Sequence, residues 1–227
     1  MHSGFILQPT YRIREDRPVV QLFGRLESGE AFLVEDDRFR PYFFIHKAQE
    51  ALLGDEHDVR IEATALRDLR GREVVRVTAR TPSAVPHIRN RLLERGCEVL
   101  EGDIRFVYRY LIDRGIRGAV AIDGPHEVLE KGLLRFRNPE LRPSRSRPAL
   151  RALSVDLETS PDASRIFSAA LVGDDVEEVH LVSKQPVEGA VDHSDERLFL
   201  AGVMARIREI DPDILVGWNV IDFDLRV

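Results

Sequence analysis

The chain has 227 residues, 43% of them hydrophobic, with 33 basic and 39 acidic side chains and a net charge of −6. This length and apolar content are sufficient for two domains with buried cores. No apolar run is long enough to cross a bilayer, and Met1–Gly4 lacks the basic and apolar stretches of a secretory signal. The one cysteine, Cys97, cannot form an internal disulfide, so we expect the protein to reside in a reducing cytoplasm. We expect the Cys97 side chain to be buried as a small apolar group.

Charge is distributed unevenly along the chain. Residues 151–227 hold 7 basic and 16 acidic side chains, a net charge of −9, whereas residues 1–150 hold 26 and 23, a net charge of +3. We expect the acidic part to bind cations and the mildly basic part to meet phosphates.

The first hundred residues predict mainly strands. Apolar runs at 19–26 and 31–34 flank Glu27–Glu30 as a hairpin, and the aromatic-rich Pro41–Ile45 adds a third strand. Its aromatic side chains are expected in the core, with stacking on bases as the alternative. A strand at 74–79, a helix at about 83–95 that ends at Gly96, and a strand at 97–100 form a unit similar to half of a ferredoxin-like fold.

Residues 134–151 contain six arginines and three prolines. Because proline at this density opposes regular structure, we predict a linker or extended arm between two domains, 1–145 and 146–227. Two readings of its arginines remain open. Either the segment is a solvated connector, or some of Arg142, Arg145 and Arg147 contact a DNA backbone.

Two carboxylates, Asp156 and Glu158, lie at the end of the apolar stretch Ala152–Thr159. Side chains two apart on a strand share a face, so these acids should point one way while Leu153, Val155 and Leu157 pack the other way. A divalent cation such as magnesium or manganese would relieve their mutual repulsion. The alternative is a solvated turn at the end of a strand.

The residues that follow predict two strands and a helix. Runs at 165–172 and 176–182 flank Gly173–Asp175 as a hairpin. The apolar residues that follow recur at helical spacing and predict a helix. Ser194 is its expected N-cap, and Asp211–Pro212 should end it.

The last stretch, Asp213–Val227, begins with a short apolar run at 214–216, which is typical of a buried strand. Gly217 allows a turn, and Asp222 and Asp224 follow it. Either acid could start a helix as a capping charge, and Asp224 could instead join the two earlier acids.

This order of elements resembles the start of a ribonuclease-H-like fold. More narrowly, Asp156–Glu158 resembles the first motif, and Asn219–Asp224 the second, of the 3′ to 5′ proofreading exonuclease in family B DNA polymerases, with Gly217–Asn219 most similar to the bacterial DNA polymerase II branch. The segment Glu101–Gly115 is similar to the one that leads into that exonuclease. The implied fold class is a mixed α+β amino-terminal domain followed by part of an α/β exonuclease domain.

The resemblance also implies site residues and cofactors. Asp156, Glu158 and Asp224 match the catalytic, metal-binding carboxylates, while Asn219 and Phe223 match positions that shape the second motif and meet the nucleic acid. Asp222 is not carried over. The family mechanism uses two metal ions, Mg²⁺ or Mn²⁺, to hydrolyse the 3′-terminal phosphodiester without a covalent enzyme intermediate.

The resemblance further implies partners and a truncation. We expect single-stranded template DNA, a 3′ primer end and, in the parent enzyme, a sliding clamp as partners, and no membrane. The third exonuclease motif and the polymerase aspartates have no counterpart here. We therefore expect an amino-terminal fragment of a polymerase that is itself inactive and self-associates through an uncovered face.

Two other classes of function remain open. The chain could be a non-catalytic nucleic-acid-binding module whose acids cap and solvate strand ends. It could also be a phosphoacceptor or another magnesium-binding α/β domain.

Overall fold

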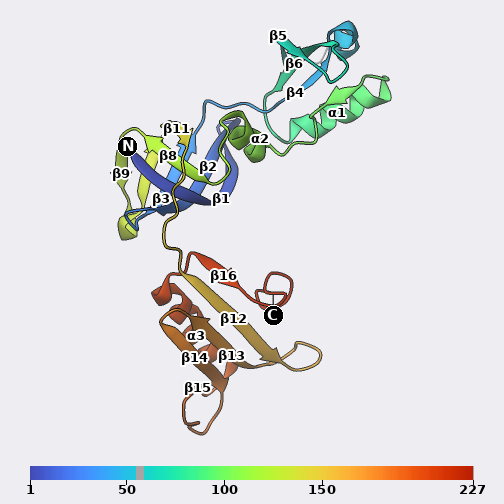
Figure 1. Ribbon diagram of the computed structural model, residues 1–227. Helices are drawn as coiled ribbons and strands as arrows, with labels where there is room; N and C mark the ends of the chain where they lie inside the picture. Colours follow the sequence, from blue (N-terminus) through green and yellow to red (C-terminus); the bar gives the residue numbers. More distant parts are fainter. Residues whose placement is uncertain (55–58, 227) are drawn as a thin grey trace. The chain divides into compact units, whose positions relative to one another are not determined.

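The computed structural model describes residues 1–54 and 59–226, so Val227, the last residue of the expected second domain, lies outside it. The chain divides into two compact units, Met1–Pro148 and Ala149–Val227 (Figure 1). None of the helices in the described residues is long and apolar enough to cross a membrane.

A seven-stranded sheet forms the larger part of the first unit. Its strand order is β11-β8-β1-β2-β3-β10-β9, and the neighbouring strands are antiparallel except for the parallel pair β3 and β10. The strands are β1 (His2–Arg14), β2 (Arg17–Leu26), β3 (Ala31–Asp36), β8 (Ala119–Asp123), β9 (His126–Val128), β10 (Leu134–Arg137) and β11 (Glu140–Pro143).

Helix α2 (Phe106–Asp113) closes the core of this sheet. Tyr110 is fully buried, and its hydroxyl donates a 2.8 Å hydrogen bond to Asp36, which is also fully buried. Burial alone would raise the pKa of Asp36, but hydrogen bonds from Arg38 and Tyr110 outweigh it and lower that pKa below its ordinary value. The buried carboxylate therefore joins β3 to α2 with its hydrogen-bonding capacity satisfied.

The second sheet of this unit has the order β5-β6-β4-β7 and packs against helix α1 (Ala84–Glu94). Its strands are β4 (Tyr42–His46), β5 (Val59–Arg67), β6 (Glu73–Ala79) and β7 (Val99–Leu100), and a 3₁₀ helix, η1 (Lys47–Leu53), follows β4. Cys97 is buried in this core beside Val99, as expected, and burial raises the pKa of its thiol.

The prediction that residues 134–151 form a linker or extended arm is wrong for residues 134–143. Residues 134–137 form β10 and residues 140–143 form β11, separated by a turn in which Asn138 has a φ of 50°. The prolines fit because Pro139 lies in the turn and Pro143 ends an edge strand, where a missing N–H costs least. Residues 144–151 form no helix or strand.

The second unit is a five-stranded sheet with the order β15-β14-β13-β12-β16. Its elements are β12 (Ala152–Thr159), β13 (Ile166–Gly173), β14 (Val176–Val182), β15 (Val191–His193), helix α3 (Glu196–Ile210) and β16 (Ile214–Val216). Apolar residues of β12, β13 and α3 share one core, so α3 covers one face of the sheet. Strand β16 lies parallel to β12 and beside it, although some sixty residues separate them along the chain.

Helix α3 begins one residue later than the sequence suggested. Asp195, not Ser194, is the N-cap, and its carboxylate accepts a hydrogen bond from the Leu198 amide at 2.9 Å. The helix ends where Asp211 adopts a left-handed conformation with φ 49°, directly before Pro212.

Candidate metal centre

Strand β12 carries the first two acids of the candidate site. Leu153 and Val155 are buried in the core beneath α3, while Asp156 and Glu158 are exposed on the opposite face. This alternation follows from the two-residue period of a strand. The apolar face thus fixes the strand, and the acids project from the face that α3 does not cover.

The second acidic segment reaches β12 through β16. Ile214–Val216 pairs in parallel with Ala152–Ser154, and the chain then turns at Gly217. A Cβ at Gly217 would lie 2.5 Å from the Val155 carbonyl oxygen, so only glycine allows the backbone to pass this close to the strand. Residues 218–226 form a series of turns instead of the expected helix start.

Asp224 is the residue that joins the two segments. Its Oδ1 accepts a 3.1 Å hydrogen bond from the backbone amide of Leu157, the residue between Asp156 and Glu158. Strand β16 pairs with β12 only as far as Ser154. The Asp224 carboxylate therefore accepts a hydrogen bond from a β12 amide, that of Leu157, which lies beyond the end of this pairing. The side chain of Asp224 is buried, being 8% exposed.

The other oxygen of Asp224, Oδ2, is buried and has no hydrogen-bond partner. A buried carboxylate oxygen without a donor is costly unless a cation or a proton compensates its charge. Carboxylate oxygens are also the ligands that Mg²⁺ and Mn²⁺ prefer. The unpaired Oδ2 of Asp224 is therefore chemically suited to a divalent cation.

The three carboxylates do not form a complete ligand set. In residues 1–54 and 59–226, no group of three or more His, Cys, Asp or Glu side chains is positioned to hold a metal ion. The structure brings Asp224 to the peptide between the other two acids, but it leaves Asp156 and Glu158 exposed and not converged on it.

The remaining residues of the second motif shape the turn. Asn219 has a φ of 61°, and its carbonyl accepts a 2.9 Å hydrogen bond from the Phe223 amide. Phe223 is half-buried, and Asp222 is exposed with a 3.8 Å ion pair to Arg226. The hydrogen bond between Phe223 and Asn219 thus stabilises the turn that carries Asp224 to β12, whereas the exposed Asp222 pairs with Arg226.

The three arginines of the predicted nucleic-acid surface lie in the first unit. Arg142 is on β11, opposite Ala121 of β8, and Arg145 and Arg147 follow in the segment without regular structure. All three side chains are exposed, and none forms an ion pair with a described residue. They are available to bind phosphate.

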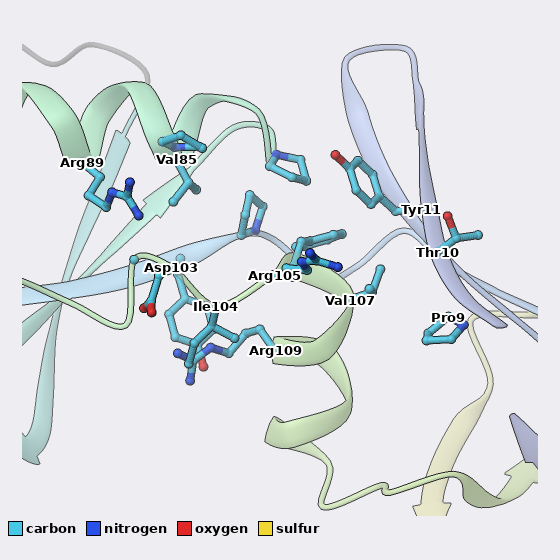
Figure 2. Close-up of a pocket in the computed structure, with 16 residues that line it drawn as sticks. Pro9, Thr10, Tyr11, Val85, Arg89, Asp103, Ile104, Arg105, Val107 and Arg109 are labelled. Atoms are coloured by element: carbon cyan, nitrogen blue, oxygen red, sulfur yellow. The ribbon is translucent and has the colours of Figure 1, made fainter. Parts of the chain in front are cut away.

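The first unit contains a pocket of about 410 Å³ that the sequence did not predict. Figure 2 shows that β1, α1, the segment before α2 and α2 itself contribute side chains to it. Its walls combine Arg89, Arg105 and Arg109 with the rings of Tyr11, Tyr42 and Phe106, a set suited to an aromatic or anionic ligand. The segment 101–109 was singled out only for its resemblance to known polymerases.

Tyr42 is held firmly in the wall of this pocket. Arg76 and Arg109 lie over its ring at 4.4 and 4.9 Å, and its hydroxyl donates to Asp113 at 2.7 Å. Burial, together with the hydrogen bond to Asp113, raises the pKa of Tyr42 to about 12. Arg109 is itself buried and pairs with Glu101 at 2.5 Å. These contacts connect Tyr42 on β4 to Arg76 on β6 and to Arg109 and Asp113 on α2.

Comparison with known proteins places the chain in a family. Residues 97–227 match the model of the DNA polymerase family B exonuclease domain. A DNA polymerase from Archaeoglobus fulgidus is 28% identical over 98% of this chain, and DNA polymerase II from Escherichia coli K12 is 28% identical over 99% of it. The solved family B DNA polymerase from Pyrobaculum calidifontis superimposes with a TM-score of 0.79 at 28% identity, over 99% of this chain and 31% of that one.

The chain spans about 29% of the length of the curated relatives from A. fulgidus and E. coli. The family match covers both acidic segments, and the structural match covers nearly the whole chain. The chain belongs to the family B DNA polymerases.

Proposed function

We propose that this chain is the amino-terminal part of a DNA polymerase of the polymerase II type and carries the first two acidic motifs of its 3′ to 5′ proofreading exonuclease. In this proposal, residues 146–227 are the first half of a ribonuclease-H-like exonuclease domain. Residues 1–145 are the domain on the template side.

One observation carries the proposal, namely the contact between Asp224 and β12. The carboxylate is buried with one oxygen on the Leu157 amide and the other without a donor. A carboxylate that only capped a turn would be expected to satisfy both of its oxygens with donors or solvent. A bound cation would compensate the buried oxygen that lacks a donor here.

Asp156, Glu158 and Asp224 have distinct roles in this proposal. Asp224 would hold a divalent cation with the oxygen that does not bind the Leu157 amide, and Asp156 and Glu158 would supply further ligand oxygens from exposed side chains. When bound, two Mg²⁺ or Mn²⁺ ions activate a water molecule and stabilise the departing 3′ oxygen. Asn219 and Phe223 hold the turn, so they position Asp224 and line the path of the 3′ end.

The first unit supplies contacts to the template strand in this proposal. Arg142, Arg145 and Arg147 are exposed and without ion-pair partners among the described residues, so they can neutralise phosphates. Such contacts fix the position of a strand without reading its sequence.

The chain alone should bind metal weakly and remove 3′ nucleotides poorly. Its three acids are not converged in the described residues, and two-metal catalysis depends on ligands that are held in place beforehand.

The experiment measures Mn²⁺ binding to residues 1–227 by electron paramagnetic resonance. Asp156→Asn, Glu158→Gln and Asp224→Asn should each weaken binding at least about 10-fold, a loss typical even for partners that only support a ligand. Asp222→Asn is the matched control, because Asp222 lies in the same turn but is exposed and paired with Arg226. Equal loss in all four variants would mean nonspecific binding and would contradict the proposal.

A non-catalytic nucleic-acid-binding module is the alternative, and the exposed arginines favour it. In that case the chain would bind single-stranded DNA with a salt-dependent affinity but would show no Mn²⁺ site that depends on Asp224. Replacing Arg142, Arg145 and Arg147 together with Ala tests the surface itself. An unchanged salt dependence would identify the segment as a solvated connector.

A further inference from the structure

Trp218 is the only tryptophan of the chain, and 92% of its side chain is exposed. It lies between Gly217 and Asn219, the two residues at which the backbone turns after β16. Among the described residues, its ring makes no aromatic or cation–π contact. A large indole left open to solvent is unusual, because tryptophan is normally buried to a high degree.

Trp218 lies in a turn that contacts β12 at two points. On one side of it, Gly217 lies against the Val155 carbonyl oxygen, closely enough that a Cβ would sit 2.5 Å away. On the other side, Asp224 binds the Leu157 amide. The two ends of this short segment therefore contact β12 on either side of Asp156. The indole projects from a segment that is fixed to the strand immediately next to the exposed carboxylates.

Trp218 differs chemically from the other exposed apolar residues of this turn. Ile221 and Leu225 are 74% and 58% exposed, but they carry no flat π surface. A nucleobase presents a π face to any aromatic ring, and stacking of the two contributes substantially to single-strand binding. Acidic neighbours repel the phosphates of a strand, so a base contact is the interaction that can hold a terminal nucleotide here without adding charge.

We propose that Trp218 stacks on a nucleobase of the single-stranded 3′ end whose terminal phosphodiester lies at Asp156, Glu158 and Asp224. This assignment rests on the proposed exonuclease function and adds a substrate-positioning residue to it. The 3′-terminal base of a duplex is paired and stacked on its neighbour, so it reaches a separate stacking partner only at the cost of both interactions. Stacking on Trp218 therefore selects unpaired ends, which are the ends that a mismatch produces.

The single tryptophan makes the test specific to this residue. Indole fluorescence of residues 1–227 is titrated with a short oligothymidylate in EDTA, so that no metal is bound and no hydrolysis occurs. Saturable quenching is expected. An oligonucleotide of equal length with abasic sites at its 3′ end should quench much less, and a blunt duplex should not quench.

Affinity measured by anisotropy of a labelled oligonucleotide extends the test to variants. Trp218→Ala should weaken binding about 5- to 150-fold, and Trp218→Phe, which keeps an aromatic ring, should recover most of the loss. Leu225→Ala is the control, because it removes an exposed side chain from the same turn without a π surface, and its effect should stay within about 2-fold.

Three results would overturn the inference. They are quenching that is absent, quenching that is equal for duplex and single strand, or equal losses in Trp218→Ala and Leu225→Ala. A change in emission with protein concentration and no response to DNA would instead identify a contact between copies of the chain.

Failure here is distinguishable from failure of the proposed exonuclease function. Mn²⁺ binding that depends on Asp224, without quenching by DNA, would remove only the stacking role. Quenching without Mn²⁺ binding would leave Trp218 as a DNA contact and remove the metal site.

Discussion

Asp224 has a role that conflicts with the stability of its own unit. Its Oδ1 satisfies a backbone amide, but its Oδ2 keeps a charge in a buried position without a donor. An unpaired buried charge destabilises the folded state, and a bound cation removes that cost. Under the proposed function, cation binding would offset this cost.

The variant Asp224→Asn measures this conflict. It keeps an oxygen for the Leu157 amide and removes the charge, so in EDTA it should be more stable than the natural chain by about 1 kcal/mol in urea unfolding. With Mg²⁺ the order should reverse, because only the natural carboxylate gains from the ion. The control Asp222→Asn should change stability by less than about 0.5 kcal/mol in both buffers. Lower stability of Asp224→Asn in EDTA would mean that the carboxylate is fully paired.

The candidate residues could be named from the sequence because their spacing matches a known pattern, but their geometry could not. The alternation along β12 follows from the strand period alone. The contact of Asp224 with the Leu157 amide depends on Gly217 and on the left-handed Asn219, two backbone features that only a folded turn reveals. The pocket that includes Tyr42 and Arg109 was missed because its walls come from segments far apart in the chain.

At the scale of elements, the prediction succeeded where the pattern was local. The hairpins of β2 with β3 and of β13 with β14, and helices α1 and α3, all appear near their expected positions. Strands β10 and β11 were missed because their pairing with other strands, β10 with the remote β3 and β11 with β8, overrides the effect of proline. Local composition cannot reveal such pairing.

A histidine pair links β14 to β15 beneath α3. His180 Nδ1 and His193 Nε2 are 3.0 Å apart, and their rings are stacked with an interplanar angle of 9°. Glu178, itself paired with Arg206 of α3, faces the other nitrogen of His180. Burial, followed by the proximity of His180, lowers the pKa of His193, while Asp192 acts in the opposite direction.

This lowered pKa predicts a pH dependence. The folded unit favours neutral His193, so the stability contribution is complete above the unfolded pKa of about 6.5 and is lost as the pH falls below it. Urea unfolding should therefore show a lower midpoint at about pH 5.5 than at about pH 7.5. His193→Gln, which cannot be protonated, should reduce that difference. His87→Gln, at an exposed position on α1, is the control and should not reduce it.

At the scale of the whole molecule, the two units have separate cores. The first unit contains two hydrophobic clusters and the second contains one. Residues 144–150, which span the boundary between the units, form no helix or strand. Each unit therefore has its own basis for stability, and the segment that connects them lacks the hydrogen-bond ladder of a helix or strand.

Limited proteolysis tests this division. Trypsin should cut first at the Arg145–Ser146 bond, because Arg145 is exposed in the irregular segment and the next residue after Arg147 is a proline. Arg151 should be protected, since its side chain binds Asp211 and the Ile210 carbonyl. Mass spectrometry identifies the cut, and Arg145→Gln should delay it while Arg147→Gln should not. A first cut inside the sheet of either unit would contradict the division.

The parallel pairing of β16 with β12 has a consequence for how such a protein can vary. Strand β13 runs back along β12 from Thr159 to Leu153, so the β13–β14 turn lies at the end of the sheet remote from the acids. Residues inserted at Asp174–Asp175 would lengthen a distant loop and leave the register of β12 with β16 intact. Lineages can therefore gain or lose chain at that turn while the acidic end of the sheet keeps its geometry.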